Sequence, residues 1–291
     1  MRKVGFIGLG NMGKGICKNI IEAGNKVTVF DANREAMQRF EGKAVLADDV
    51  MQVFHASDVI FLSLPNSNIV ENIMEQFFAE GVKGKVIVDT STSYPMSTKK
   101  LAKRMKEEGG TLVDAPLMAG PDEAEAGELE IVVGGDKADF ESLSDLFGAY
   151  CKKYSYVGES GSGHLAKLAI NFCSLSEALI FAQVFPVMAK LGMKQEDLFQ
   201  ILNCEALANW VFDFYSKKYV NKNYRLDFAL ALGLKDLSYM KRLYEELNIP
   251  GFILDGALDL CRVSLQEQKE GEVLDFSYPC QTMYEYVGLD K

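Results

Sequence analysis

A lysine lies near the start of a long apolar segment, where a charged side chain is costly to bury. Residues 161–172 read GSGHLAKLAINF, and the sequence stays mainly apolar as far as Pro186. At helical spacing, Lys167, Asn171 and Ser174 fall on one face and form a polar stripe on an otherwise apolar helix. Such a stripe needs a polar neighbour, which can be another helix, water or a ligand. The lysine therefore either extends to the surface or takes part in chemistry.

A partly buried lysine can transfer the proton in a hydride-transfer reaction. Oxidation of an alcohol needs a group that takes the hydroxyl proton, and a positive charge stabilises the developing oxyanion. Burial lowers the pKa of a lysine towards neutrality. The only two histidines are His55, on a predicted surface helix, and His164, one turn before Lys167. Lys167 is therefore the candidate acid/base and His164 a rival. Asn171 could hold the substrate or orient the Lys167 ammonium.

A second chemical motif lies at the N-terminus. The segment VGFIGLGNMG places Gly8, Gly10 and Gly13 in the spacing GxGxxG, after a predicted strand and before a predicted helix. In that context the glycines allow a tight turn, close approach of a pyrophosphate, and close packing of helix on strand. The pyrophosphate then binds at the N-terminus of the helix. The alternative is a tight turn without a ligand.

Asp31 ends the next predicted strand. A carboxylate at this place accepts hydrogen bonds from the ribose hydroxyls and repels a 2′-phosphate, which favours NAD over NADP. Asp31 could also, or only, cap the following helix, and Arg34 could bind a phosphate. The expected cofactor is NAD, with NADP as the alternative.

Two kinds of segment must position these residues. In the first half, short apolar runs alternate with amphipathic segments, which predicts a mostly parallel sheet with helices on both faces. The predicted strands are 3–8, 26–30, 58–63, 85–89, 111–115 and 129–133, and the predicted helices are 12–23, 33–40, 67–78 and 95–108.

After about residue 160, long helical segments replace this alternation. The predicted helices are 162–191, 194–202, 204–218, 227–246 and 250–268, followed by a C-terminal helix capped by Asp275 or Ser277. The sequence therefore predicts an α/β fold: a doubly wound, Rossmann-type domain over 1–160, then an all-α substrate and oligomerisation domain over 161–291. The Gly- and Ser-rich stretch 158–163 separates them.

Composition excludes several classes of function. The net charge is −10 and Lys and Arg do not cluster, so a nucleic-acid partner is not expected. The six cysteines lack metal-binding spacing, so we expect free thiols, no metal site and a cytoplasmic protein. The apolar run at 178–189 is too short to span a bilayer, and the N-terminal one is too short for a signal peptide. No membrane partner is expected.

Together the motifs resemble those of the β-hydroxyacid dehydrogenases, the group of 3-hydroxyisobutyrate dehydrogenase, tartronate semialdehyde reductase and glyoxylate/succinic semialdehyde reductase. The similarity covers essentially the whole chain. The segments that carry it are GFIGLGNMG (5–13), LPN (64–66), DTSTSYP (89–95), GSGHLAKLAIN (161–171) and LKDL (234–237).

The resemblance implies a role for particular residues. It places Lys167 as the catalytic lysine, facing the cleft where substrate meets nicotinamide, and Asn171 as a substrate contact. Phe228, shortly before the LKDL segment, either lines the pocket or packs in the core. The residues implied to bind the cofactor are Gly8, Gly10, Asn11, Met12, Gly13, Asp31, Leu64, Pro65, Asn68, Thr92 and Lys235.

The chain departs from the family in its substrate loop. Residues 114–120 read DAPLMAG, so Met118 stands where the family has a serine that clamps the substrate carboxylate. Ala119 replaces the first of two glycines and only Gly120 matches, while Glu123 stands at a position that is usually small. These three loop residues, 118–120, are the expected substrate-binding segment.

Three interpretations of this loop follow, besides simple core filling by Met118. Backbone amides alone could hold the carboxylate while Met118 packs against a substrate alkyl group. The substrate could lack a carboxylate there. The pocket could also have lost its activity.

The sequence therefore predicts an NAD-dependent oxidoreductase that interconverts a small β-hydroxyacid and its semialdehyde, or a related aldehyde and alcohol. One alternative is an NADP-dependent reductase of small aldehydes such as glyoxylate or succinic semialdehyde. The other is a non-catalytic NAD(H)-binding protein. A homodimer or homotetramer is expected.

Overall fold

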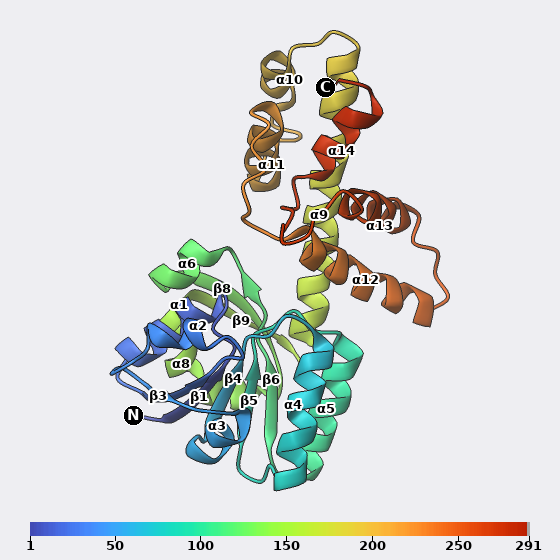
Figure 1. The fold of residues 1–291 in the computed structure, drawn as a ribbon. Helices are drawn as coiled ribbons and strands as arrows, with labels where there is room; N and C mark the ends of the chain where they lie inside the picture. The colour runs from blue at the N-terminus through green and yellow to red at the C-terminus, as the bar shows by residue number, and fades with distance from the viewer. Residues whose placement is uncertain (290–291) are drawn as a thin grey trace. The chain divides into compact units, whose positions relative to one another are not determined.

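The computed structural model describes residues 1–289, which fold as two compact units, the first over Met1–Lys167 and the second from Leu168 onwards. The sequence places the domain boundary after residue 160, in the turn before helix α9 (Ser162–Lys190). The division between the units falls inside this helix. Figure 1 shows the elements of each unit.

A mainly parallel sheet forms the centre of the first unit. The strands run in the order β3-β2-β1-β4-β5-β6-β8-β7, and β9 also pairs with β8. Pairing is parallel from β3 to β6, whereas β8 is antiparallel to β6 and β7 and parallel to β9. The strands are β1 (Lys3–Ile7), β2 (Lys26–Phe30), β3 (Val45–Leu46), β4 (Val59–Leu62), β5 (Val86–Asp89), β6 (Thr111–Asp114), β7 (Leu117–Met118), β8 (Leu129–Gly134) and β9 (Cys151–Gly158).

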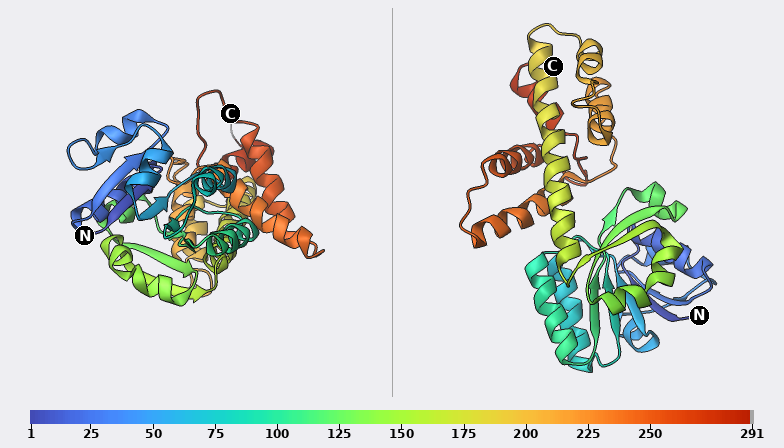
Figure 2. Two further views of the ribbon diagram at one scale, coloured as in Figure 1. Left: turned by 90° about the horizontal axis from the view of Figure 1, so that it is seen from below. Right: turned by 180° about the vertical axis from the view of Figure 1, so that it is seen from behind.

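Helices cover both faces of this sheet because successive side chains of a strand point to opposite faces. Phe61 and Val88 belong to one core cluster, with residues of α1 and α8, while Ile60 and Ile87 belong to another, with residues of α3, α4 and α5. Figure 2 shows the helices around the sheet from two further directions. The helices are α1 (Gly13–Glu22), α2 (Arg34–Gln38), α3 (Val50–Ala56), α4 (Ser67–Glu80), α5 (Pro95–Glu107), α6 (Pro121–Ala126), α7 (Lys137–Ser142) and α8 (Ser144–Tyr150).

The doubly wound sheet followed by a helical unit is confirmed, and each of the six predicted strands is present. The sequence does not predict β3, β7, β9, α6, α7 or α8, and it predicts α3 only as the surface helix that carries His55. The strands β3 and β7 are only two residues long, too short to show a period. β9 carries mostly exposed and half-buried side chains, so it forms because β8 offers an edge and not because of its own pattern.

In the described part of the second unit, the regular elements are all helices, apart from an isolated bridge between Ala229 and Asp275. Its core is rich in aromatic side chains and includes Phe185, Tyr219 and Phe276, each fully buried. The helices besides α9 are α10 (Gln195–Leu202), α11 (Trp210–Val220), α12 (Leu230–Glu246), α13 (Phe252–Leu265) and α14 (Pro279–Tyr286).

Taken as a whole, α9 is longer and more apolar than the run 178–189 indicates. By length and composition it could cross a membrane, and half of its most apolar window is buried inside the protein. A core helix of a water-soluble domain has the same properties.

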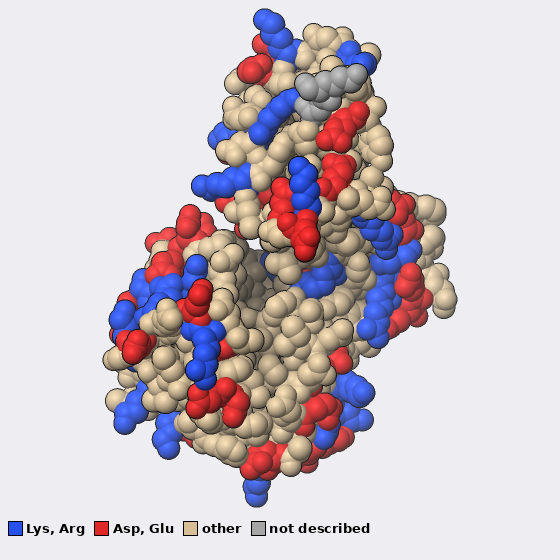
Figure 3. All heavy atoms as spheres, viewed as in Figure 1, with Lys and Arg blue, Asp and Glu red and all other residues tan. Residues whose placement is uncertain are grey.

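Charged side chains of both signs are interspersed over the face shown in Figure 3, and that face has no extended basic patch.

Three predicted helix boundaries in this unit are wrong. The helix predicted from residue 204 begins at Trp210, because Asn209 caps it by accepting a hydrogen bond from the Phe212 amide. The helix predicted from residue 227 begins at Leu230, so Phe228 precedes α12 and does not lie on it. The cap of α14 is Tyr278, not Asp275 or Ser277.

Asp275 instead fixes the segment that carries Phe228. Its buried carboxylate accepts hydrogen bonds from the amides of Asp227 (2.8 Å) and Phe228 (2.9 Å) and from the ammonium of Lys218 (2.9 Å). Burial opposes ionisation, but these bonds and those from Ser277 outweigh it and lower the pKa of Asp275. The ionised group therefore stabilises the connection before α12.

Replacing Asp275 by Asn is expected to lower the free energy of unfolding by about 1–3 kcal/mol at neutral pH, because buried donors lose a charged acceptor. The contribution is fully present above the pKa of an unfolded aspartate, about 3.9, and is lost as the pH falls through the lower pKa of the folded protein. The difference between variant and wild type should stay constant from about pH 7 to pH 5 and shrink below about pH 4. Urea unfolding across this range measures it.

Asp259→Asn is the matched control, because the Asp259 side chain is 72% exposed and pairs with Arg262 on the surface. Its effect should be about 0–0.5 kcal/mol at every pH. An Asp275→Asn defect that grows on acidification would contradict the assignment.

Candidate active site

The loops that follow the parallel strands carry most of the residues singled out in the sequence. Because β1, β2, β4, β5 and β6 are parallel, their carboxyl ends meet at one edge of the sheet, where α/β proteins bind their ligands. The glycine-rich segment follows β1, Asp31 follows β2, Leu64 follows β4 and Thr92 follows β5. This edge is the candidate site.

The glycine-rich segment fits a bound pyrophosphate. Gly8 has φ +96°, and a Cβ atom on it would lie 2.2 Å from the Ser63 carbonyl oxygen; one on Gly13 would lie 2.0 Å from the Gly8 carbonyl oxygen. A Cβ on Gly10 would meet nothing within 4 Å. Two glycines are therefore required by packing, while the third borders open space. Asn11 and Met12 lie between Gly10 and Gly13, the first residue of α1. Met12 is the N-cap of this helix and makes no side-chain capping bond.

Asp31 is held beside this segment. One carboxylate oxygen accepts a hydrogen bond from the Leu9 amide (2.6 Å) and the other from the Asn33 amide (2.7 Å). The interpretation of Asp31 as a helix cap is wrong, because the N-cap of α2 is Asn33. Arg34 pairs with Asp48 on the exposed surface at 3.1 Å. Asp31 thus joins β2 to the turn in which the phosphates are expected.

The loops after β4 and β5 are tied to each other. The Leu64 amide donates to the Ser91 hydroxyl (2.9 Å), and the Ser91 amide donates to the Asp89 carboxylate (2.9 Å). Leu64 and Thr92 are half-buried, whereas Pro65 and Asn68 are exposed. The structure brings these cofactor candidates to the same sheet edge, and their individual roles stay predictions.

The first turn of α9 is fixed at the end of β6. The fully buried carboxylate of Asp114 accepts hydrogen bonds from the amides of Gly161 (2.7 Å) and His164 (2.9 Å). These bonds satisfy amides that would otherwise lack a partner. A negative charge at the N-terminal end of α9 also interacts favourably with the helix dipole. A Cβ on Gly163 would lie 2.8 Å from the carbonyl oxygens of Asp114 and Val132. The Gly-Ser-Gly sequence therefore has a packing reason.

Lys167 lies one turn along α9 from this anchor and is half-buried. Its neighbours Leu165 and Ile170 are 36% and 41% exposed, so the start of α9 is less buried than its sequence predicts. The anchored helix end gives Lys167 a fixed backbone position. Its role as the acid/base stays a prediction.

His164 is not a rival acid/base. Its side chain is fully buried, with Nε2 3.0 Å from the Ser91 carbonyl oxygen and Nδ1 2.8 Å from the Thr98 hydroxyl. Both ring nitrogens are engaged inside the protein, so the ring has no access to a substrate. Among residues 1–289, no group of three or more His, Cys, Asp or Glu side chains is placed to hold a metal ion.

In the second unit, Asn171 and Lys235 share a partner that the sequence analysis did not single out. The Asn171 amide donates to the Asp236 carboxylate (2.7 Å), whose other oxygen is 3.1 Å from the Lys235 ammonium. Asp236 is only 3% exposed. The LKDL segment already places Asp236 next to Lys235, and a neighbouring carboxylate is a natural partner for a lysine. Phe228 is half-buried, with its ring centroid 6.0 Å from that of Phe276.

The divergent loop has an unusual backbone. Met118 ends β7 and is half-buried, so it is not core filling, and Ala119 is exposed with φ +81°. The Gly120 amide donates to the Glu123 carboxylate at 3.0 Å, which completes the cap of α6. An acidic side chain therefore occupies the Gly120 amide, one of the backbone donors of this loop.

Comparison with known proteins agrees with this geometry. A family model described as the NAD binding domain of 6-phosphogluconate dehydrogenase matches residues 3–158. Another, described as NAD-binding of NADP-dependent 3-hydroxyisobutyrate dehydrogenase, matches residues 161–280. The 2-(hydroxymethyl)glutarate dehydrogenase of Eubacterium barkeri is 34% identical over 259 residues, 85% of this chain and 84% of that protein. The chain belongs to the β-hydroxyacid dehydrogenase family.

Further relatives of this β-hydroxyacid dehydrogenase have similar lengths. The 2-hydroxy-3-oxopropionate reductase of Escherichia coli (strain K12) is 34% identical over 81% of this chain and 82% of that protein. The 3-hydroxyisobutyrate dehydrogenase of Mycobacterium tuberculosis matches 97% of this chain and 99% of its own with a TM-score of 0.88. At 23% identity, that likeness shows the fold alone.

For this β-hydroxyacid dehydrogenase, Asp31→Asn is expected to shift cofactor preference from NADH towards NADPH by about tenfold. The amide keeps an acceptor for the Leu9 amide but removes the charge that repels a 2′-phosphate. Fluorescence titration with both cofactors measures the ratio of dissociation constants, which cancels any general loosening of the loop.

Glu41→Gln is the control, because it removes an exposed carboxylate just after α2 and leaves both Asp31 and the pair of Arg34 with Asp48 intact. Its ratio should match that of the wild type. An unchanged ratio in Asp31→Asn would show that Asp31 does not select the cofactor.

Proposed function

We propose that this β-hydroxyacid dehydrogenase interconverts a small β-hydroxyacid, or a related alcohol, and its semialdehyde, with NAD as cofactor. Family membership makes the chain an NAD(P)-dependent oxidoreductase that acts on a hydroxyl or aldehyde group. The observation that carries the specific proposal is the anchored first turn of α9, which holds Lys167 one turn beyond the sheet edge.

Lys167 is the proposed general acid/base. When bound, the nicotinamide supplies or accepts the hydride. In reduction, the Lys167 ammonium protonates the carbonyl oxygen, and its positive charge stabilises the oxyanion as it develops. In oxidation, the neutral amine takes the hydroxyl proton. Asn171, Phe228 and the 118–120 loop are proposed to position the substrate, and Lys235 to contact the cofactor.

The bond between Gly120 and Glu123 favours a second candidate for the substrate class. Since the Gly120 amide already donates to a carboxylate of the protein, a substrate carboxylate at this loop would meet a like charge. Met118 cannot replace the family's serine as a hydrogen-bond donor. The loop therefore favours an aldehyde and alcohol pair whose group at this position is not an anion.

We also propose that the protein is a homodimer or homotetramer in the cytoplasm. Large apolar side chains are exposed on the second unit, and a second copy of the chain would cover them. Three of them are Trp210 (69% exposed), Phe252 (84%) and Ile253 (66%).

Lys167→Ala is expected to lower kcat by about 10²- to 10⁴-fold, the usual contribution of a positioned acid/base. NADH and NADPH consumption is followed with a panel of semialdehydes and uncharged aldehydes. Cofactor affinity should change little, because the proposed role is in proton transfer.

Lys190→Ala is its control, since it removes a lysine from the opposite end of the same helix. It should retain wild-type turnover. Equal activity of Lys167→Ala and wild type would remove Lys167 from the mechanism. Tight NADH binding by wild type without turnover of any carbonyl would favour a non-catalytic protein.

Glu123→Gln tests the substrate loop. The amide keeps the bond from the Gly120 amide but removes the charge, so kcat/KM for a carboxylate-bearing aldehyde should rise about tenfold relative to an uncharged aldehyde of the same length. Asp122→Asn, on an exposed neighbour, should leave the ratio unchanged. An unchanged ratio in Glu123→Gln would show that the substrate binds away from this carboxylate.

A further inference from the structure

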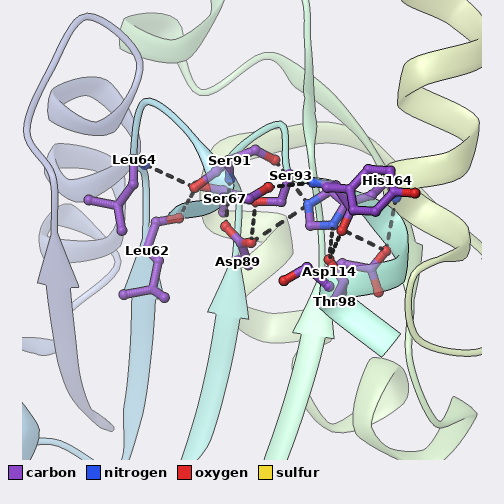
Figure 4. A network of polar contacts seen from close by, with 12 residues as sticks. Leu62, Leu64, Ser67, Asp89, Ser91, Ser93, Thr98, Asp114 and His164 are labelled. Atoms are coloured by element: carbon purple, nitrogen blue, oxygen red, sulfur yellow. Dashed lines mark hydrogen bonds and ion pairs between the residues drawn. The ribbon is translucent and has the colours of Figure 1, made fainter. Parts of the chain in front are cut away.

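A buried polar cluster lies where β5 and β6 end (Figure 4). It consists of Asp89, Asp114 and His164, which are 1%, 0% and 0% exposed. In His164, Nε2 is 3.8 Å from an Asp89 oxygen and Nδ1 is 3.9 Å from an Asp114 oxygen. Ionisable groups are seldom buried this completely unless they are paired or hydrogen-bonded.

Both carboxylates are occupied by donors other than the imidazole. Asp89 accepts hydrogen bonds from the Ser91 amide (2.9 Å) and the Ser93 hydroxyl (2.8 Å). Asp114 accepts from two amides at the start of α9. The ring of His164 therefore has other direct partners.

Those partners come from two different segments. The Ser91 carbonyl can only accept, so Nε2 of His164 carries a proton and donates to it. Nδ1 contacts the Thr98 hydroxyl on α5, which can donate to it. Through one ring, α9 is joined to the loop after β5 and to α5.

These connections include the segments assigned to the reaction. Ser91 precedes Thr92 in the chain, and the Ser91 hydroxyl also accepts a hydrogen bond from the Leu64 amide. His164 precedes Lys167 by one helical turn. The ring thus sets the spacing between the loop of Thr92, which is expected to bind the cofactor, and the helix of Lys167.

We propose that His164 is a positioning residue for proton transfer by Lys167. It fixes the first turn of α9 against the Thr92 loop and does not itself exchange a proton with the substrate. The proposal rests on the proposed function of Lys167. A misplacement of about 1 Å at an acid/base is enough to cost about a hundredfold in rate, so rigid spacing at this point matters for catalysis.

Three variants separate positioning from folding. His164→Leu fills much of the space but removes both hydrogen bonds. His164→Gln offers an N–H for the Ser91 carbonyl and a carbonyl for the Thr98 hydroxyl. Thr98→Val keeps the shape of residue 98 and removes only the partner of Nδ1. Each is assayed for kcat and KM, with active enzyme counted by NADH titration.

Turnover per NADH-binding site is expected to fall at least about tenfold in His164→Leu while KM changes less than about threefold. His164→Gln should stay within about threefold of wild type, with Thr98→Val between the two. A purely structural role would lower the number of binding sites and leave turnover per site unchanged. That result, or equal losses in His164→Gln and His164→Leu, would overturn the proposal.

A second measurement does not depend on turnover. Acetylation of lysines by acetic anhydride, read by mass spectrometry, reports the environment of Lys167, with Lys190 on the same helix as the internal reference. The Lys167 to Lys190 ratio should change at least about threefold in His164→Leu and less in His164→Gln. An unchanged ratio in His164→Leu would overturn the proposal. If His164→Leu does not fold, an unchanged ratio in Thr98→Val would overturn it. An inactive wild type with a changed ratio would overturn the proposed function alone.

Discussion

The carboxylate of Asp114 binds the first turn of α9, and the placement of the candidate site depends on this contact. A buried charge is stable only when hydrogen bonds replace its hydration, and the amides of Gly161 and His164 do so here. The contact brings the helix so near the sheet that Cβ atoms on Gly134 and Gly163 would meet Asp114 at under 3 Å. The Asp114 carboxylate at the end of β6 therefore determines where α9 starts, and this start determines the position of Lys167.

Most of the sheet could be predicted from the sequence because its signals are local. Apolar runs such as VIFL in β4 and VIV in β5 lie in the interior of the sheet, where both faces are covered, so they do not alternate with polar residues. β9 and the start of α11 could not be predicted in this way. β9 exists because β8 leaves an edge to pair with, and α11 begins where Asn209 caps it, later than its apolar residues indicate.

The site follows the same division. The glycines of the first turn and Lys167 stand at spacings that a sequence displays, so they could be identified early. The roles of His164 and Asp114 could not, because each is defined by a partner distant in the chain, Thr98 and Gly161 respectively. Asp236 stands beside Lys235 in the LKDL segment, but its contact with Asn171 depends on the fold. A buried histidine and a catalytic one look alike until the atoms around both ring nitrogens are known.

The central place of β1 has a consequence for how the chain reaches this structure. β1 is the first strand made, yet it lies between β2 and β4, and β4 leaves the ribosome only after α1, β2 and the following helices. Until then an apolar strand has one free edge that can pair with other chains. Pairing between strands so distant in sequence is slow, whereas the helices of the second unit form from nearby residues. The nascent first unit is therefore the part of the chain that needs protection from aggregation during synthesis.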